Sequence, residues 1–210
     1  MRIHVSALWR PFLIVLCLLI VPSGLRASTV YNNLGSTSDG SDPISSFGPL
    51  ADSFATGSSN FSFDSLTVLL DVSSTDSSGS VTASLLSNNS GAPGSSLLVL
   101  GTVSDLSLST SLTDYTFSFS TYTLLADTTY WIQLSSSNGS VAYWAWSLDQ
   151  SAQGVAGQFF SNEDGVFPNT DGPYQMEVGG TGTSATPEPS SLFLAFTGLL
   201  GLAPLRRKLL

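Results

Sequence analysis

Carboxylates, hydroxyls and amides are the groups that could do chemistry in the central part of this chain. From Ser28 to Thr186 the sequence has no Lys, Arg, His or Cys, and only Glu188 of its 15 acidic residues lies outside that interval. Nucleophilic triads and most zinc, copper and haem sites need His or Cys, and phosphate-binding loops need Lys. Nucleic acid needs basic partners for its phosphates. The composition therefore predicts a protein that is not an enzyme and does not bind nucleic acid.

Acidic turns offer oxygen ligands for calcium. The candidate ligands lie close together in the sequence and are Asn162, Glu163, Asp164 and Asp171. Ca²⁺ binds several carboxylate and loop carbonyl oxygens, although the spacing here is not that of an EF-hand. Asp and Asn also favour turns that bind no metal. We therefore expect no cofactor, with calcium at these four residues as the alternative.

Aromatic side chains gather between residues 130 and 146, where exposed rings could stack on sugars. Strand alternation places Tyr143 on one face and both Trp144 and Trp146 on the other. We expect the two tryptophans to pack in the core, because aromatic side chains are the main large apolar groups of this chain. Tyr130 and Tyr143 are then the candidates for carbohydrate stacking.

A pair of carboxyl groups could also hydrolyse a glycosidic bond. Glu163, Asp164 and Glu177 are the available partners. Such enzymes need two carboxyl groups at a set separation across a sugar cleft, which a sequence does not reveal. A chain with this many acids has close pairs by chance, so hydrolysis ranks behind binding.

The N-terminus has the three regions of a secretory signal peptide. A weakly basic start precedes the apolar run 12–21, and Ala27 is a small residue at the expected cleavage point. The run is shorter than the ~20 residues of a membrane-spanning helix. We expect signal peptidase to remove residues 1–27.

The C-terminus has the parts of a sorting tail, residues 187–210. The motif Pro187, Glu188 and Pro189 precedes an apolar stretch, which ends at the basic residues Arg206, Arg207 and Lys208. Residues 190–205 would form a helix of about 24 Å, which spans a ~30 Å hydrocarbon core with some thinning. The basic cluster would stay cytoplasmic. We expect a transient insertion in the inner membrane.

The segments between the two ends have the pattern of β-strands. Gly and Pro punctuate them, and polar and apolar residues alternate in several. About nine segments carry this signal: 50–55, 61–70, 81–86, 97–100, 114–119, 128–134, 141–146, 157–160 and 174–178. Residues 87–94 are expected to form a loop because turn residues fill them.

This pattern predicts an all-β fold, a single jelly-roll-like β-sandwich of about nine strands over residues 28–178. Residues 179–186, rich in Gly, Thr and Ser, are expected to form a flexible linker to the tail. A signal-peptide helix and a transmembrane sorting helix would flank the sandwich.

The tail resembles the PEP-CTERM sorting signal of Gram-negative bacteria. Pro187-Glu188-Pro189, the glycine-bearing apolar stretch and the basic cluster carry this resemblance. It implies recognition by a membrane exosortase, removal of the tail, and export in species that make exopolysaccharide. The body is similar to the choice-of-anchor R domain at 48–54, 91–94, 129–132 and 173–176, and that family has no established activity.

Both ends together predict an exported protein that is anchored briefly and then stays at the cell surface or in the extracellular matrix. The expected role is structural or adhesive, in association with exopolysaccharide. A calcium-assisted carbohydrate-binding module is the alternative, and a carboxylate-based glycoside hydrolase is the third interpretation. Removal of both ends would leave a body with a side-chain charge of −14.

Overall fold

The computed structural model describes residues 26–44, 49–75, 78–151, 153–154, 159–161, 167–168 and 172–182. They belong to one compact unit, Arg26–Thr183. The expected signal-peptide helix and sorting helix lie outside the described residues. Within these residues the fold is all-β, as the sequence predicts, and consists of two antiparallel sheets.

The first sheet has six strands in the order β12-β11-β3-β8-β5-β6. Their bounds are β12 Phe167–Pro168, β11 Phe159–Ser161, β3 Leu50–Ala55, β8 Thr129–Ser137, β5 Ser80–Asn89 and β6 Ala92–Ser104. A short 3-10 helix, η1 (Asp105–Ser107), follows β6 and leads to the second sheet.

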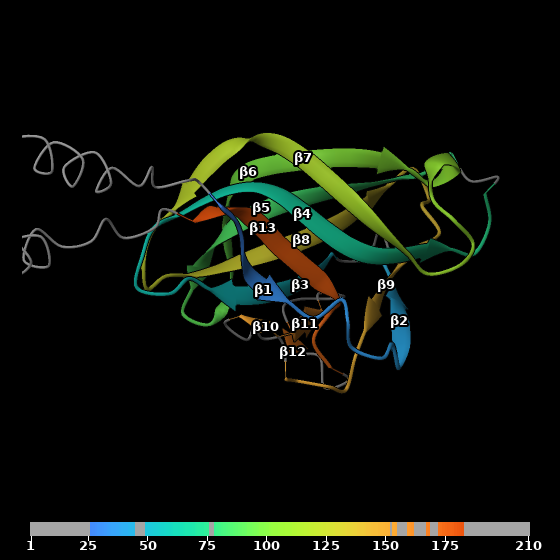
Figure 1. Ribbon diagram of the computed structural model, residues 1–210. Helices are drawn as coiled ribbons and strands as arrows, with labels where there is room; N and C mark the ends of the chain where they lie inside the picture. Colours follow the sequence, from blue (N-terminus) through green and yellow to red (C-terminus); the bar gives the residue numbers. More distant parts are fainter. Residues whose placement is uncertain are drawn as a thin grey trace, which may run out of the picture. The chain divides into compact units, whose positions relative to one another are not determined.

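The second sheet has seven strands, six of them in the order β10-β1-β13-β4-β9-β2, with β7 paired to β4. Their bounds are β10 Gln153–Gly154, β1 Arg26–Asn32, β13 Met176–Gly182, β4 Phe61–Val72, β9 Ala142–Trp146, β2 Gly40–Pro43 and β7 Thr113–Leu124. β7 follows β4 along one edge from Phe61 to Leu70, and β13 and β9 share the other edge (Figure 1).

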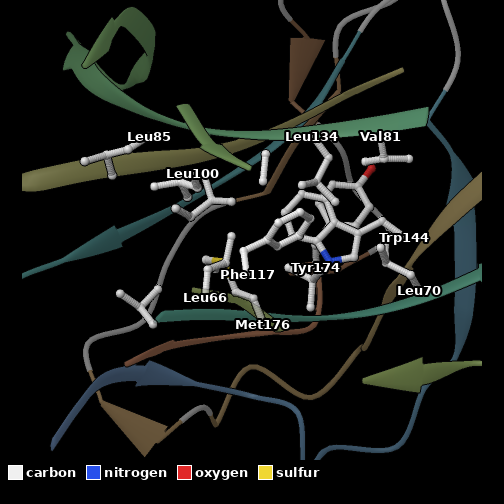
Figure 2. Packing of buried hydrophobic residues seen from close by; sticks show 14 of the residues in the cluster. Leu66, Leu70, Val81, Leu85, Leu100, Phe117, Leu134, Trp144, Tyr174 and Met176 are labelled. Carbon is white, nitrogen blue, oxygen red and sulfur yellow. The ribbon is translucent and has the colours of Figure 1, made fainter. Parts of the chain in front are cut away.

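The core lies between the two sheets because alternate residues of each strand are apolar. Phe63, Leu66, Val68 and Leu70 of β4 are all buried. Figure 2 shows Leu66 and Leu70 in the same cluster as Leu85 and Leu134 of the other sheet. The six-stranded and seven-stranded sheets therefore form a two-layer sandwich.

Aromatic side chains fill one part of this core. The rings of Trp144 and Tyr174 stack with centroids 4.6 Å apart and an interplanar angle of 16°. Trp144 Nε1 donates to the carbonyl of Gln175 at 3.0 Å, and Tyr174 Oη donates to Asp42 Oδ2 at 2.7 Å. Trp146 packs half-buried against the same cluster. The expected core packing of the tryptophan pair is confirmed, most fully for Trp144.

All of the predicted strand segments overlap a strand, but the expected loop at 87–94 is wrong. β5 continues to Asn89 and β6 begins at Ala92, so only Ser90 and Gly91 remain between them. These two residues have φ values of 54° and 88°. Positive φ at both central positions defines the tight hairpin turn that matches the twist of adjacent strands. The sequence also missed β1, β2 and the short strands β10 and β12.

The expected linker boundary is wrong as well, because Gly179–Gly182 belong to β13. A Cβ on Gly180 would lie 2.0 Å from the Ser62 carbonyl oxygen, and one on Gly179 would lie 2.7 Å from Ser65 Oγ. β13 lies between β1 and β4 in the sheet, and glycine is needed at these positions because β13 approaches β4 closely there. A run of glycines that suggests flexibility in the sequence is a packed part of the sheet.

The expected signal-peptide cleavage point lies at the start of β1. Arg26 and Ala27 pair with Gly182 and Thr181. Cleavage after Ala27 would leave the pairing of β1 with β13 from Ser28 onward.

Candidate functional site

A cavity of about 140 Å³ opens on the outer face of the six-stranded sheet. Its volume corresponds to roughly five water molecules at ~30 Å³ each. Three strands and a hairpin turn that are distant in the sequence line it. The described lining residues are Ser53, Phe54, Ala55, Asn88, Gly91, Thr129 and Trp131.

Strand register brings the first group of lining residues together. Ser53 of β3 lies opposite Trp131 of β8, and Ala55 lies opposite Thr129. Tyr130 lies between the two β8 residues and belongs to the core cluster, so Thr129 and Trp131 project from the other face. The cavity is therefore built on the surface that faces away from the core.

The β5–β6 hairpin supplies the other wall of the cavity. Asn88 Oδ1 accepts hydrogen bonds from Trp131 Nε1 at 3.0 Å and from Gly91 N at 3.2 Å. Ser87 Oγ accepts from Ser95 N at 3.0 Å, across the same hairpin. These bonds fix the turn against β8 and satisfy the indole N–H.

Trp131 belongs to a small apolar cluster on this outer face. Ala51, Leu86 and Trp131 are all buried there, apart from the main core. Leu86 lies opposite Trp131 in the β5–β8 pairing. Because the indole is fully buried, neither face of its ring is open for stacking on a sugar. Its role beside the cavity is to support the lining rigidly.

The described lining residues of the cavity are partly polar and partly apolar, and none of them is charged. The amide of Asn88 and the hydroxyls of Ser53 and Thr129 are its polar side-chain groups. Hydroxyls both donate and accept, and the amide nitrogen donates two hydrogen bonds. This set of groups suits a neutral ligand that is rich in hydroxyls, since it offers nothing to pair with an ionised group.

Several of the described acidic residues stabilise the fold by accepting hydrogen bonds, and Asp105 is the clearest example. Its carboxylate is buried and accepts from Ser140 Oγ at 2.7 Å and from Val141 N at 2.9 Å. Its own backbone N donates to the carbonyl of Gly79 at 3.0 Å. Asp105 thus ties η1 to the β4–β5 and β8–β9 connections at one end of the sandwich.

Loop carboxylates at other places also accept from protein donors. Asp39 Oδ2 accepts from Leu148 N at 2.7 Å, and Asp149 Oδ2 accepts from Ser36 Oγ at 3.2 Å. Hydrogen bonds from the hydroxyl and backbone amide of Ser151 lower the pKa of Asp149. Hydroxyl and amide donors therefore take the place that Lys and Arg fill in other proteins.

Glu177, one of the carboxyl groups considered for hydrolysis, is held in the same way. It lies on β13 and accepts from Thr29 Oγ1 at 2.9 Å and from Asn32 Nδ2 at 3.1 Å. Its described partners are neighbours on β1, so its contacts are those of a sheet-stabilising residue. Glu163 and Asp164, the other two candidates, lie outside the described residues.

The calcium candidates Asn162, Glu163, Asp164 and Asp171 all lie outside the described residues. Among the residues that are described, no group of three or more His, Cys, Asp or Glu side chains is arranged to hold a metal ion. The sorting motif Pro187, Glu188 and Pro189 and the basic residues Arg206, Arg207 and Lys208 also lie outside the described part of the chain.

The aromatic candidates are not brought together. Tyr130 is 5% exposed, its ring packs on Phe54 with centroids 6.0 Å apart, and its Oη accepts from Leu125 N at 3.0 Å. The expectation of sugar stacking is therefore wrong for Tyr130, whose ring belongs to the core. Tyr143 is half-buried on β9, in the other sheet.

Trp131, one residue further along, is the aromatic residue beside the cavity. Gln133 could have indicated that Trp131 faces outward, because residues two apart on a strand share a face. A polar residue at 133, between the apolar residues 132 and 134, marks the outer face of β8.

Asp52 is a buried acid that the sequence analysis missed. It lies on the core face of β3 opposite Ile132, and Oδ1 accepts from Ser53 N at 2.8 Å, whereas Oδ2 has no hydrogen-bond partner among the described residues. Burial raises the pKa of Asp52 well above its ordinary value, although the backbone amides of Ser53 and Tyr174 act to lower it. Its position between Leu50 and Phe54, on the apolar phase of β3, was the available signal.

No protein-family model matches the chain, and no curated protein matches it. Within the described ranges, no helix has the length and apolar character that a membrane span requires.

Proposed function

We propose that this chain is an exported surface or matrix protein of a Gram-negative bacterium, with a structural or adhesive role in association with exopolysaccharide. The observation that carries the proposal is the distribution of charge. The six basic residues all lie near the ends, at Arg2, Arg10, Arg26, Arg206, Arg207 and Lys208. This arrangement suits two processed ends around an acidic body. The role is non-catalytic, in line with the lack of His, Cys and Lys from Ser28 to Thr186.

The route of export follows from the two ends. A signal-peptide helix directs the chain across the inner membrane, and signal peptidase removes it. The sorting helix then inserts transiently, and an exosortase-type enzyme acts at the Pro187-Glu188-Pro189 motif. The body is released to the cell surface or the matrix.

The sandwich is of the jelly-roll type, and the strand order supports this assignment. One sheet contains the run β2-β9-β4 with β7 on the far edge of β4, and the other contains β3-β8-β5-β6. Eight strands that alternate between two sheets in this way make a double Greek key. Strands β1 and β13 extend the seven-stranded sheet beside β4. Lectin domains use this architecture among others, so the fold alone assigns no ligand.

Carbohydrate binding is the second candidate, and the uncharged cavity beside Trp131 favours it. The calcium-assisted form of this function depends on residues 162–171. Calorimetry separates the two roles: a thermal midpoint that rises in millimolar Ca²⁺, with retention on polysaccharide, would establish the calcium-assisted module in place of the structural role.

The main proposal is tested in a bacterium that has an exosortase and makes exopolysaccharide. We compare the full chain with a variant that lacks residues 187–210 and with Glu188→Ala. The expected result is a product of the full chain in the surface or matrix fraction whose intact mass lacks both ends. A full-length product in the cytoplasm, or identical sorting of all three chains, would contradict the proposal.

A further inference from the structure

We propose that the cavity beside Trp131 binds one uncharged sugar residue, without calcium. This inference rests on the proposed association with exopolysaccharide and names the site of that contact. It differs from the calcium-assisted interpretation because none of the described lining residues is acidic.

The orientation of the Asn88 amide supplies the first argument. Oδ1 receives the N–H groups of both Trp131 and Gly91, so the flip of the amide is determined by its partners. The side chain is exposed, and its NH₂ group is left to donate to a ligand. The hydrogen bond from the buried indole holds this donor in a fixed position before a ligand arrives, which lowers the cost of ordering it.

The Thr129 hydroxyl supplies the second argument. Thr129 is half-buried on β8 and lies opposite Ala55 of β3. Both residues line the wall of the cavity that faces the Asn88 hairpin. Its hydroxyl can donate to one sugar oxygen or accept from a sugar hydroxyl. The methyl groups of Thr129 and Ala55 add apolar surface for the C–H edge of the ring. Few polar groups on an apolar surface are typical of small-ligand sites.

Size and charge define the ligand class. A cavity of about 140 Å³ accommodates a single sugar residue or a chain end, and not an extended segment of polysaccharide. The body between Ser28 and Thr186 has acidic residues and no basic ones, so a uronate would be repelled and would find no cation. The site therefore selects neutral sugars, and its affinity is expected to change little with salt.

The experiment uses the exported protein with a panel of glucose, galactose, mannose and glucuronate, and with a neutral polysaccharide column. Binding is followed by tryptophan fluorescence and calorimetry in the presence of EDTA. Asn88→Asp keeps the acceptor for Trp131 and Gly91 but removes the two amide donors. Thr129→Val removes the hydroxyl at nearly constant shape. Thr123→Val is the matched control, because Thr123 is exposed on β7 of the other sheet.

We expect at least one neutral sugar to bind in EDTA and glucuronate not to bind. One lost hydrogen bond corresponds to an affinity about threefold to tenfold weaker for Thr129→Val, and Asn88→Asp should lose more. Thr123→Val should bind as the natural chain does. Unchanged thermal midpoints would show that all three variants fold.

Two results would overturn the inference. Equal affinity in all variants would place the sugar elsewhere while leaving the association with polysaccharide intact. A lack of binding by the natural chain to every neutral sugar and to the column would also overturn it. Sorting to the matrix is measured separately, so the proposed function fails only when that assay fails.

Discussion

Replacement of Asp105 by Ala tests whether a carboxylate can hold together loops that have no cation to pair with. The substitution removes the acceptor of Ser140 Oγ and Val141 N, at 2.7 and 2.9 Å. A hydrogen bond to a charged group contributes about 1.5–3 kcal/mol, and a buried donor left without a partner costs energy as well. We therefore expect Asp105→Ala to lower the free energy of unfolding by about 3–5 kcal/mol, a large part of the 5–15 kcal/mol of a typical domain.

Asp105→Asn separates the charge from the shape of this side chain. The amide oxygen can accept from Val141 N, while the amide nitrogen donates to Ser140 Oγ, because a hydroxyl also accepts. Both bonds survive as neutral bonds, which are about half as strong as charge-assisted ones. The expected loss is about 1–2 kcal/mol, clearly smaller than that of the alanine variant.

The assay is urea unfolding of the purified protein, followed by the fluorescence of the buried tryptophans. Asp114→Ala is the control, because Asp114 is an exposed acid on β7 and its loss should stay within about 0.5 kcal/mol. A loss below about 1 kcal/mol for Asp105→Ala, or equal losses for the Ala and Asn variants, would refute the reasoning.

Three further predictions concern pH, packing and proteolysis. Because burial raises the folded-state pKa of Asp52 above its unfolded value, the folded state binds the proton more tightly, and stability should rise as pH falls from neutral toward about 4. Asp52→Asn should flatten this slope in the thermal midpoint, and an unchanged slope would show that Asp52 does not cause it. Gly180→Ala should destabilise by about 1–3 kcal/mol in urea because its Cβ would meet the Ser62 carbonyl at 2.0 Å, whereas Gly57→Ala has nothing within 4 Å and should not. Trypsin should leave the processed body intact even when it is denatured, since Ser28 to Thr186 has no Lys or Arg; internal tryptic fragments would contradict the expected processing.

The strands of the core were predictable because alternation of apolar residues is a local signal. The segments 50–55 and 61–70, for example, begin where β3 and β4 begin. Glycines misled the prediction at 179–182, since a sequence does not distinguish a glycine that flexes from one that lets β13 approach β4. β1 has an irregular register and β2 has four residues, so neither gave a clear periodic signal.

The cavity could not be predicted from the sequence, because it depends on strand order. Ser53, Asn88 and Trp131 come from three strands that are far apart along the chain. They meet because β8 lies between β3 and β5. The aromatic residues at 130–146 include the β8 residue that lies beside the cavity. The sequence alone did not show whether Tyr130 or Trp131 faces outward, because a shift of one residue along a strand moves a side chain from the core face to the outer face.

The lack of lysine between Ser28 and Thr186 leaves the edges of the sheets without a common protection against aggregation. Exposed edge strands invite pairing with other chains, and proteins commonly place Lys there to prevent it. This body has no Lys to use. Within the described residues, β10 and β12 are two residues long, and β2 has four and ends at Pro43. These short strands offer little backbone for another chain to pair with.

The two long edge strands are protected by irregular pairing. β6 contains Pro93 near its start and has three register shifts against β5, and β7 has one shift against β4. Bulges of this kind twist an edge and interrupt its row of donors and acceptors. The acidic body can therefore stay unaggregated through backbone geometry at its edges and through mutual repulsion between its carboxylates. Asp105 binds hydroxyl and amide donors in place of a cation, and the sheet edges are protected by bulges and short strands in place of lysine. In this domain, hydroxyl groups and the backbone thus replace basic side chains both in binding carboxylates and in preventing aggregation.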